Sequence, residues 1–182
     1  MPDALGPPCL TANVDMALNP TMRRELSKEC RAQFRKMMKS QFPEYREAKG
    51  QGVPKGSYPW IRQDPSGIWF QIWLVIDSTR DAFTIEAIWS FDNIRPTRMY
   101  PDENKILDEP CLFRMNRLWS GQDYWWLLVL RPEEYERSIS FYKDDPVEQC
   151  LQLVAPAIWD AAEKLKDHLM PVFDKILRPQ NK

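Results

Sequence analysis

Apolar positions follow two different periods along the chain. Near each end they recur every three to four residues, which is the period of a helix with one buried face, and in the middle they recur in strand-like runs. Asn19-Pro20 predicts the start of the first helix, because asparagine caps free N–H groups and proline has the φ of a first helical turn. The apolar positions of this helix are Met22, Leu26, Cys30, Phe34, Met37 and Met38.

The middle of the chain predicts a sheet. Its five strands are expected at residues 58–63, 68–76, 82–90, 112–119 and 124–130. Asp64-Pro65-Ser66-Gly67 has the residue order of a type I turn between the first two, and residues 120–123 are expected to turn the last two into a hairpin. Such short connections predict antiparallel neighbours.

The last third is helical again. Asp145-Pro146-Val147-Glu148 combines a capping side chain, a first-turn proline and a glutamate three residues after the cap. Pro156 and Pro171 cannot donate a helical hydrogen bond, so a kink or break is expected at each. The prediction is an α+β fold, a five-stranded mostly antiparallel sheet packed by an N-terminal helix and a kinked C-terminal helical segment. Residues 19–178 are expected to form one domain, between a flexible arm at 1–18 and a tail at 179–182.

The predicted sheet centre is apolar on both faces. In 68–76 the even positions are aliphatic or phenylalanine, and the odd positions are Trp69, Gln71, Trp73 and Val75. An antiparallel sheet with one wet face would alternate apolar with polar, so both faces need cover. Two arrangements are open. If the helices lie on opposite faces, the tryptophans are core; if both lie on the aliphatic face, Trp69, Gln71 and Trp73 are left for a partner, a ligand or a second copy of the chain.

The first helix also carries a basic stripe. Its members are spaced by three or four residues and lie on the side away from the apolar positions: Arg24, Lys28, Arg31, Arg35 and Lys39. A stripe of this kind is usually a solvated face. The functional alternatives are that it docks an acidic protein partner, or that it forms a single-stranded nucleic-acid platform together with exposed tryptophans.

Catalytic and metal-binding patterns are missing from the sequence. The one histidine, His168, excludes multi-histidine metal sites, and the widely spaced Cys9, Cys30, Cys111 and Cys150 form no zinc-like pair. The carboxylates near strand ends or faces are expected to serve turns or, for Glu86, a solvated strand face. No enzyme activity and no cofactor are therefore expected.

Length and charge add little more. The chain has 182 residues and a net charge of -1, so attraction of the whole molecule to nucleic acid or to an anionic membrane is not expected. The start of the chain does not resemble a signal peptide and no run approaches the length of a membrane span, so we expect a soluble cytoplasmic protein with four thiols.

These observations favour a non-catalytic protein-binding module, such as an adaptor or a small cognate inhibitor of the immunity-protein type. Its partner is expected to be a protein, and self-association through the sheet is a further expectation. The alternative is a single-stranded nucleic-acid-binding domain, and the third is a hydrolase or small-ligand pocket among the tryptophans.

Overall fold

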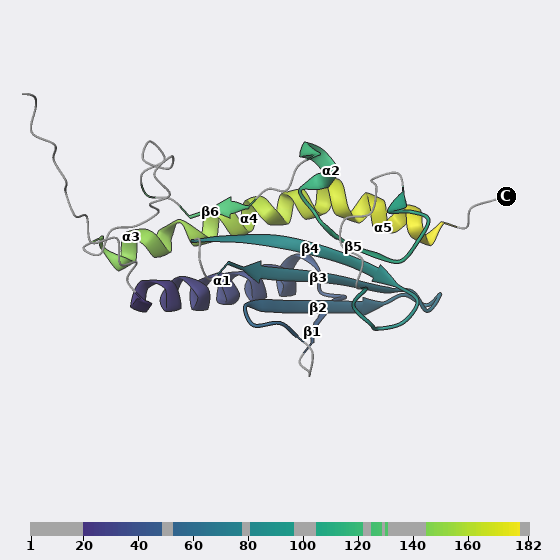
Figure 1. Ribbon diagram of the computed structural model, residues 1–182, viewed down its shortest axis with the longest axis horizontal. Helices are drawn as coiled ribbons and strands as arrows, with labels where there is room; N and C mark the ends of the chain where they lie inside the picture. Colours follow the sequence, from purple (N-terminus) through teal and green to yellow (C-terminus); the bar gives the residue numbers. More distant parts are fainter. Residues whose placement is uncertain are drawn as a thin grey trace, which may run out of the picture.

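The computed structural model confirms the α+β fold (Figure 1). It describes residues 20–48, 53–77, 81–96, 105–121, 125–128, 130 and 145–178. The predicted arm at 1–18, the cap at Asn19 and the tail at 179–182 lie outside these residues.

The sheet is antiparallel throughout, in the order β1-β2-β3-β4-β5, with β6 paired to β4 (Figure 1). The strands are β1 (Arg46–Glu47), β2 (Ser57–Gln63), β3 (Trp69–Ile76), β4 (Ala82–Ser90), β5 (Cys111–Arg114) and β6 (Trp126–Leu127). The three long strands begin and end within one residue of their predicted bounds. The short edge strand β1 was not predicted.

The predicted hairpin of 112–119 and 124–130 is wrong. β5 pairs with Glu86–Trp89 of β4 and β6 pairs with Ala82–Phe83, so both lie along the same side of β4 and neither pairs with the other. Between them the chain forms the short helix α2 (Arg117–Ser120). Gly121 ends this helix with φ of 64°, a left-handed conformation that glycine adopts easily, so the Ser-Gly pair marks a helix end rather than a hairpin turn.

The turn between β2 and β3 forms as predicted. The backbone N–H of Gly67 donates to the carbonyl of Asp64 at 2.8 Å, and the N–H of Ser66 donates to the Asp64 carboxylate at 2.9 Å. The hydrogen bond from the Ser66 backbone lowers the pKa of Asp64, because it stabilises the ionised form.

The N-terminal helix is α1 (Pro20–Gln41), and the C-terminal segment comprises α3 (Val147–Gln152), α4 (Val154–Lys164), a π-helix η3 (Leu165–Leu169) and α5 (Met170–Leu177). The expected irregularities accompany both prolines. The break between α3 and α4 precedes Pro156, and the π-helix precedes Pro171. A proline has no N–H to donate to the carbonyl four residues before it, so the helical hydrogen bonding is interrupted near that residue in both places.

Both helical segments pack on the same face of the sheet. Phe70, Ile72 and Leu74 of β3 belong to one buried core with all six predicted apolar positions of α1 and with the C-terminal segment. The rings of Phe70 and Phe173 lie 4.5 Å apart. Figure 1 shows α1 and α4 running beside the strands, and α1 contacts α4. Of the two open arrangements, the chain adopts the one with both helical segments on the aliphatic face, but Trp73 on the other face is nevertheless buried, at 5% exposed.

Among the described helices, none combines the length and the apolar character that crossing a membrane would require.

Replacing Phe173 with alanine should lower the free energy of unfolding by about 3–5 kcal/mol, because the ring is fully buried against Phe70 and its loss leaves a cavity. Urea unfolding measures this change. Lys175→Ala, at an exposed position of the same helix, should stay within about 0.5 kcal/mol of the parent. Equal losses in the two variants would contradict the placement of this helix.

Candidate functional site

The face of the sheet opposite the described helices is here called the helix-free face. Its centre is the small buried cluster of Trp73, Ile88 and Leu112, which is separate from the main core. In register across three strands, Trp73 pairs with Glu86 and Glu86 with Arg114. A tryptophan, a carboxylate and a guanidinium therefore form a row across this face.

Glu86 is buried on this face, not solvated as the sequence indicated. Its side chain is 5% exposed, and its carboxylate accepts a hydrogen bond from Nη2 of Arg95 at 2.9 Å. The same guanidinium lies 4.9 Å from the ring centroid of Trp73, in cation–π range. The pattern missed this contact because Arg95 comes from the loop after β4, which turns back over the face.

A hydrogen bond between Gln71 and Asn93 is a second contact between the sheet and the loop that follows β4. The indole N–H of Trp73 donates to Oε1 of Gln71 at 2.8 Å, and Nε2 of Gln71 donates to Oδ1 of Asn93 at 3.4 Å. The buried amide thus finds partners on both of its ends, as a buried polar group requires.

Residues 91–96, here called the β4 tip, carry two large apolar side chains into solvent. Phe91 is 69% exposed and Ile94 is 66% exposed. The ring of Phe91 lies edge-on to Trp89 at 5.6 Å, and the indole of Trp89 donates to the carbonyl of Ile106 at 2.7 Å. The next residue, Leu107, is 37% exposed. Three of the four exposed large apolar side chains of the described residues therefore lie around this end of β4.

The predicted aromatic face lies on the helix-free face, but its residues differ in exposure. Gln71 and Trp73 are buried, and Trp69 is partly exposed opposite Ser90, immediately before the β4 tip. That these three residues bind a partner stays a prediction. The exposed apolar surface beside them, Phe91 and Ile94, was not predicted; the only signal for it is two isolated apolar residues in a polar stretch after a strand.

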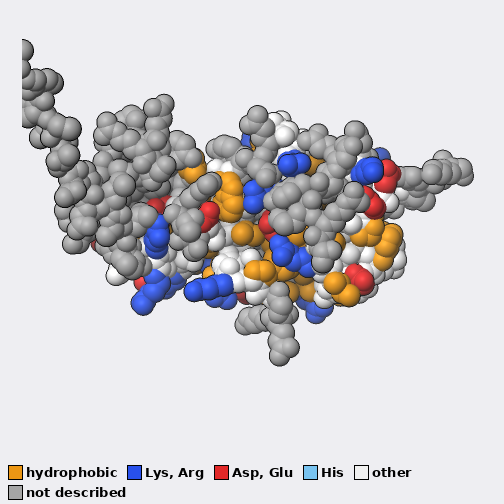
Figure 2. Space-filling model, in the orientation of Figure 1, with side chains coloured by type: hydrophobic (Ala, Val, Ile, Leu, Met, Phe, Trp, Pro, Cys, Tyr) orange, Lys and Arg blue, Asp and Glu red, His pale blue; other side chains and the backbone are white. Residues whose placement is uncertain are grey.

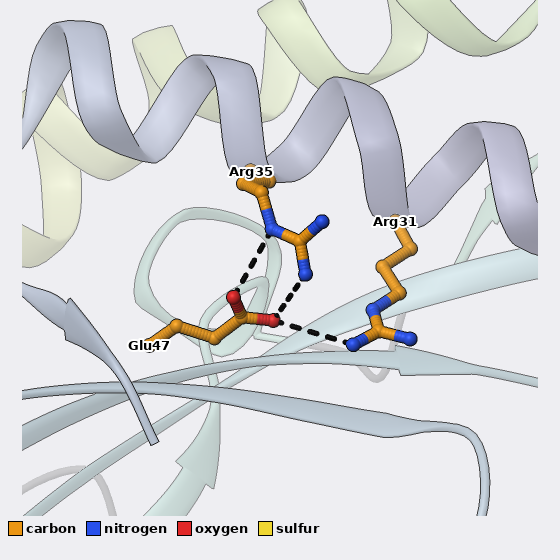
Figure 3. A network of polar contacts seen from close by, with 3 residues as sticks. All are labelled: Arg31, Arg35 and Glu47. Carbon is orange, nitrogen blue, oxygen red and sulfur yellow. Dashed lines mark hydrogen bonds and ion pairs between the residues drawn. The ribbon is translucent and has the colours of Figure 1, made fainter. Parts of the chain in front are cut away.

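The basic stripe of α1 is partly engaged inside the molecule (Figure 3). Glu47 of β1 accepts hydrogen bonds from Arg35 at 3.0 and 2.7 Å and from Arg31 at 3.5 Å. These two-point contacts lower the pKa of Glu47 and raise that of Arg35, because each partner stabilises the charge of the other. Arg31 also lies 4.9 Å from the ring centroid of Tyr58. The sequence analysis did not anticipate the contacts of the stripe with Glu47, because it did not predict strand β1.

The other members of the stripe are exposed. The side chains of Arg24 and Lys28 are 84% and 78% exposed, with Glu25 within 4 Å of each, and Lys39 is exposed near the end of α1. Basic side chains lie over α1 at the lower left of Figure 2. Their binding to an acidic partner stays a prediction.

The stripe and the predicted aromatic face do not form one surface. α1 packs on the Phe70 face of the sheet, whereas Trp69 and Trp73 lie on the other. Within the described residues, no single surface combines the tryptophans that would stack on bases with the basic side chains that would bind phosphates.

Among the described residues, the sequence candidates for chemistry are His168 and the buried thiols of Cys30, Cys111 and Cys150. The ring of His168 packs against that of Trp119, with the centroids 5.1 Å apart and the planes tilted by 30°. Burial raises the pKa of the Cys30 thiol to about 12, so it remains protonated. Within the described residues, no three His, Cys, Asp or Glu side chains gather in a way that could hold a metal ion.

No family model, curated protein or solved structure matches the chain.

The anchoring of the β4 tip can be tested by a double-mutant cycle. Arg95→Ala should destabilise the protein by about 1–3 kcal/mol, because it leaves the buried carboxylate of Glu86 without this partner. Glu86→Gln should cost about 1 kcal/mol, since the side chain of Arg95 is 34% exposed and can be solvated in part. In urea unfolding, the loss in the double variant should fall short of the sum by about 1 kcal/mol or more. Strictly additive losses would show that the two side chains do not interact.

The contact of Glu47 with Arg35 predicts a pH dependence. Since the pKa of Glu47 is lowered on folding, its stabilising contribution is present above the ordinary value of 4.5 and is lost as the pH falls through the lower folded value. Glu47→Gln should cost about 1 kcal/mol at pH 7, a modest amount because Arg35 is partly solvated. Denaturation curves at pH 7 and pH 3 should show the difference shrinking in acid, whereas Glu44→Gln, at an exposed position, should change little at either pH.

Proposed function

We propose that the protein is a non-catalytic protein-binding module, of the adaptor or small cognate-inhibitor type, that contacts its partner through the β4 tip. The observation that carries the proposal is the exposure of Phe91 and Ile94 on a loop that the sheet holds in place. Exposed apolar side chains that gather at one place are typical of interaction sites, and aromatic residues are frequent among those that dominate binding energy.

Anchoring of the tip supports this proposal. Asn93 is held by Gln71, and Arg95 by Glu86 and Trp73, so the residues flanking Ile94 are fixed on both sides. The backbone N–H of Ile94 also donates to the Asp92 carboxylate at 3.3 Å. A loop already ordered in the free protein loses less entropy when it binds, which favours affinity.

The charges around the tip define the chemistry of the partner. Among the described residues of 91–96 and 105–110, Asp92 and Asp108 are exposed, Glu109 is partly exposed, and Lys105 is the exposed basic residue. The positive charge of Arg95 is compensated by Glu86. The tip therefore suits a protein with an apolar pocket bordered by basic side chains, since complementary charge speeds encounter and disfavours other partners.

The test is a comparative capture from the native host with purified, immobilised protein. The parent chain should retain one stoichiometric protein, and the double variant Phe91→Ser/Ile94→Ser should lose it. With the captured protein purified, each single substitution should weaken binding by about 30-fold, the usual cost of removing a dominant interface residue. Both positions are solvent-exposed, so thermal unfolding should confirm that the variants remain folded.

Trp159→Ser supplies the matched control, because Trp159 is the exposed large apolar residue of α4, away from the β4 tip. Retention of the partner by this variant and loss by the tip variant would support the proposal. Equal capture by the parent and the tip variant would overturn it, as would finding by light scattering that the tip mediates only self-association.

A further inference from the structure

A cavity of about 460 Å³ lies between the first turns of α1 and the strand ends where β3 leads into β4. Its inner wall is apolar, because Leu26, Ala82 and Leu128 line it from three separate parts of the chain and are each at most 4% exposed. Arg24 and Lys55 also line the cavity and are exposed, so they stand at its mouth. The volume is within the range of small-ligand sites. The cavity therefore has an apolar interior and a polar opening.

Contacts within the chain fix the shape of the cavity. The backbone N–H of Ile76 donates to the carbonyl of Gly56 at 2.9 Å, and a Cβ at Gly56 would lie 2.9 Å from the Ile76 carbonyl oxygen. Only glycine fits this approach, which also has φ of +83°. The backbone N–H of Asp77 donates to the carbonyl of Ala82 at 3.0 Å, which closes the chain where β3 leads into β4. A site that is formed before binding loses less entropy when its ligand enters.

The ionic groups around the cavity are compensated within the chain. Arg23 forms an ion pair with the buried Asp81 at 3.6 Å, and Arg24 lies 3.8 Å from the carboxylate of Glu25. Asp77 is engaged by another group of the chain. An ionised ligand would therefore compete with an existing partner for each of these charges. The lining selects a ligand by apolar character and not by charge.

We propose that this cavity binds an uncharged small molecule with an aliphatic body and one polar head, of the class of medium-chain alcohols. Its body lies against Leu26, Ala82 and Leu128, and its head lies at the mouth, near Ser27 and Lys55. The ammonium group of Lys55 can donate a hydrogen bond to the oxygen of the head. A charged head would gain little more there, because water screens an ion pair at an exposed lysine, and it would lose part of its hydration.

This site is independent of the proposed protein-binding surface. The cavity includes Ala82 at the start of β4, whereas the β4 tip follows Ser90 at its end. Nine residues of strand separate the two ends by about 27 Å. Loss of ligand binding and loss of partner binding are therefore distinguishable, because the substitutions that affect each lie at opposite ends of the strand.

The dependence of binding on chain length tests the apolar interior. The full chain, labelled with nitrogen-15, is titrated with pentan-1-ol, hexan-1-ol and heptan-1-ol, and the amide resonances of Gly56, Ile76 and Leu128 should shift and saturate together. The affinity should rise about fourfold with each added CH₂, because each buries a further increment of apolar surface. Equal affinities along the series, or shifts that do not saturate, would overturn the proposal.

Three ligands with the same aliphatic body test the class of the head: heptan-1-ol, heptanoate and heptylamine. The alcohol should bind about threefold tighter than either ion, or more, because the ions lose hydration without displacing an existing ion pair. Equal or tighter binding of heptanoate or of heptylamine would show that a charge of the lining is available to the ligand, which contradicts the proposed class.

A substitution that fills the cavity locates the site. Ser27→Trp should abolish saturable binding of heptan-1-ol, because an indole at this lining position takes the place of the ligand. Ser40→Trp adds the same ring at an exposed position of the same helix outside the cavity, and it should leave the affinity unchanged. Thermal unfolding checks that both variants are folded, and the chain-length series on the parent chain decides the matter if Ser27→Trp does not fold. Parental affinity in a folded Ser27→Trp variant would show that the alcohol binds elsewhere and would refute this site.

Discussion

The structure depends on shielding β4 on both faces while the described helices lie on only one of them. Every residue of β4 is buried, and its side chains alternate between the main core and the helix-free face. On the helical side α1 and the C-terminal segment supply the cover. On the other side the chain brings Arg95 and Asn93 back over the sheet, and each meets a polar side chain there. The position of the β4 tip is a consequence of this second cover.

The local sequence pattern was sufficient to predict the elements that are determined by interactions between residues close together in the sequence. The apolar spacing of α1, the turn at Asp64 and the two helix irregularities all follow from interactions within a few residues, and all were predicted. The pairing of β5 and β6 was not, because Ser120-Gly121 suits both a hairpin turn and a helix end. Only the availability of the β4 side, a feature of the whole fold, decides between them.

The candidate site could be predicted only in part for the same reason. The two-sided apolar character of β3 correctly indicated that something must cover Trp73. It did not indicate Arg95, which lies 22 residues further along and reaches Trp73 through the return of a loop. Likewise, the net basic character of α1 is visible in sequence, but its partial neutralisation depends on Glu47 at the sheet edge. The periodic pattern of a single segment does not show which distant residue pairs with its charges.

The π-helix has a geometric consequence for the C-terminal segment. Leu165, Leu169 and Phe173 are fully buried and spaced by four residues. In an α-helix each step of four overshoots a full turn by about 40°, so the third side chain would swing well away from the first. The wider turns of Leu165–Leu169 absorb this excess rotation, because a π-helix takes more residues per turn. The phase of the buried stripe is thereby corrected, and the ring of Phe173 lies against that of Phe70.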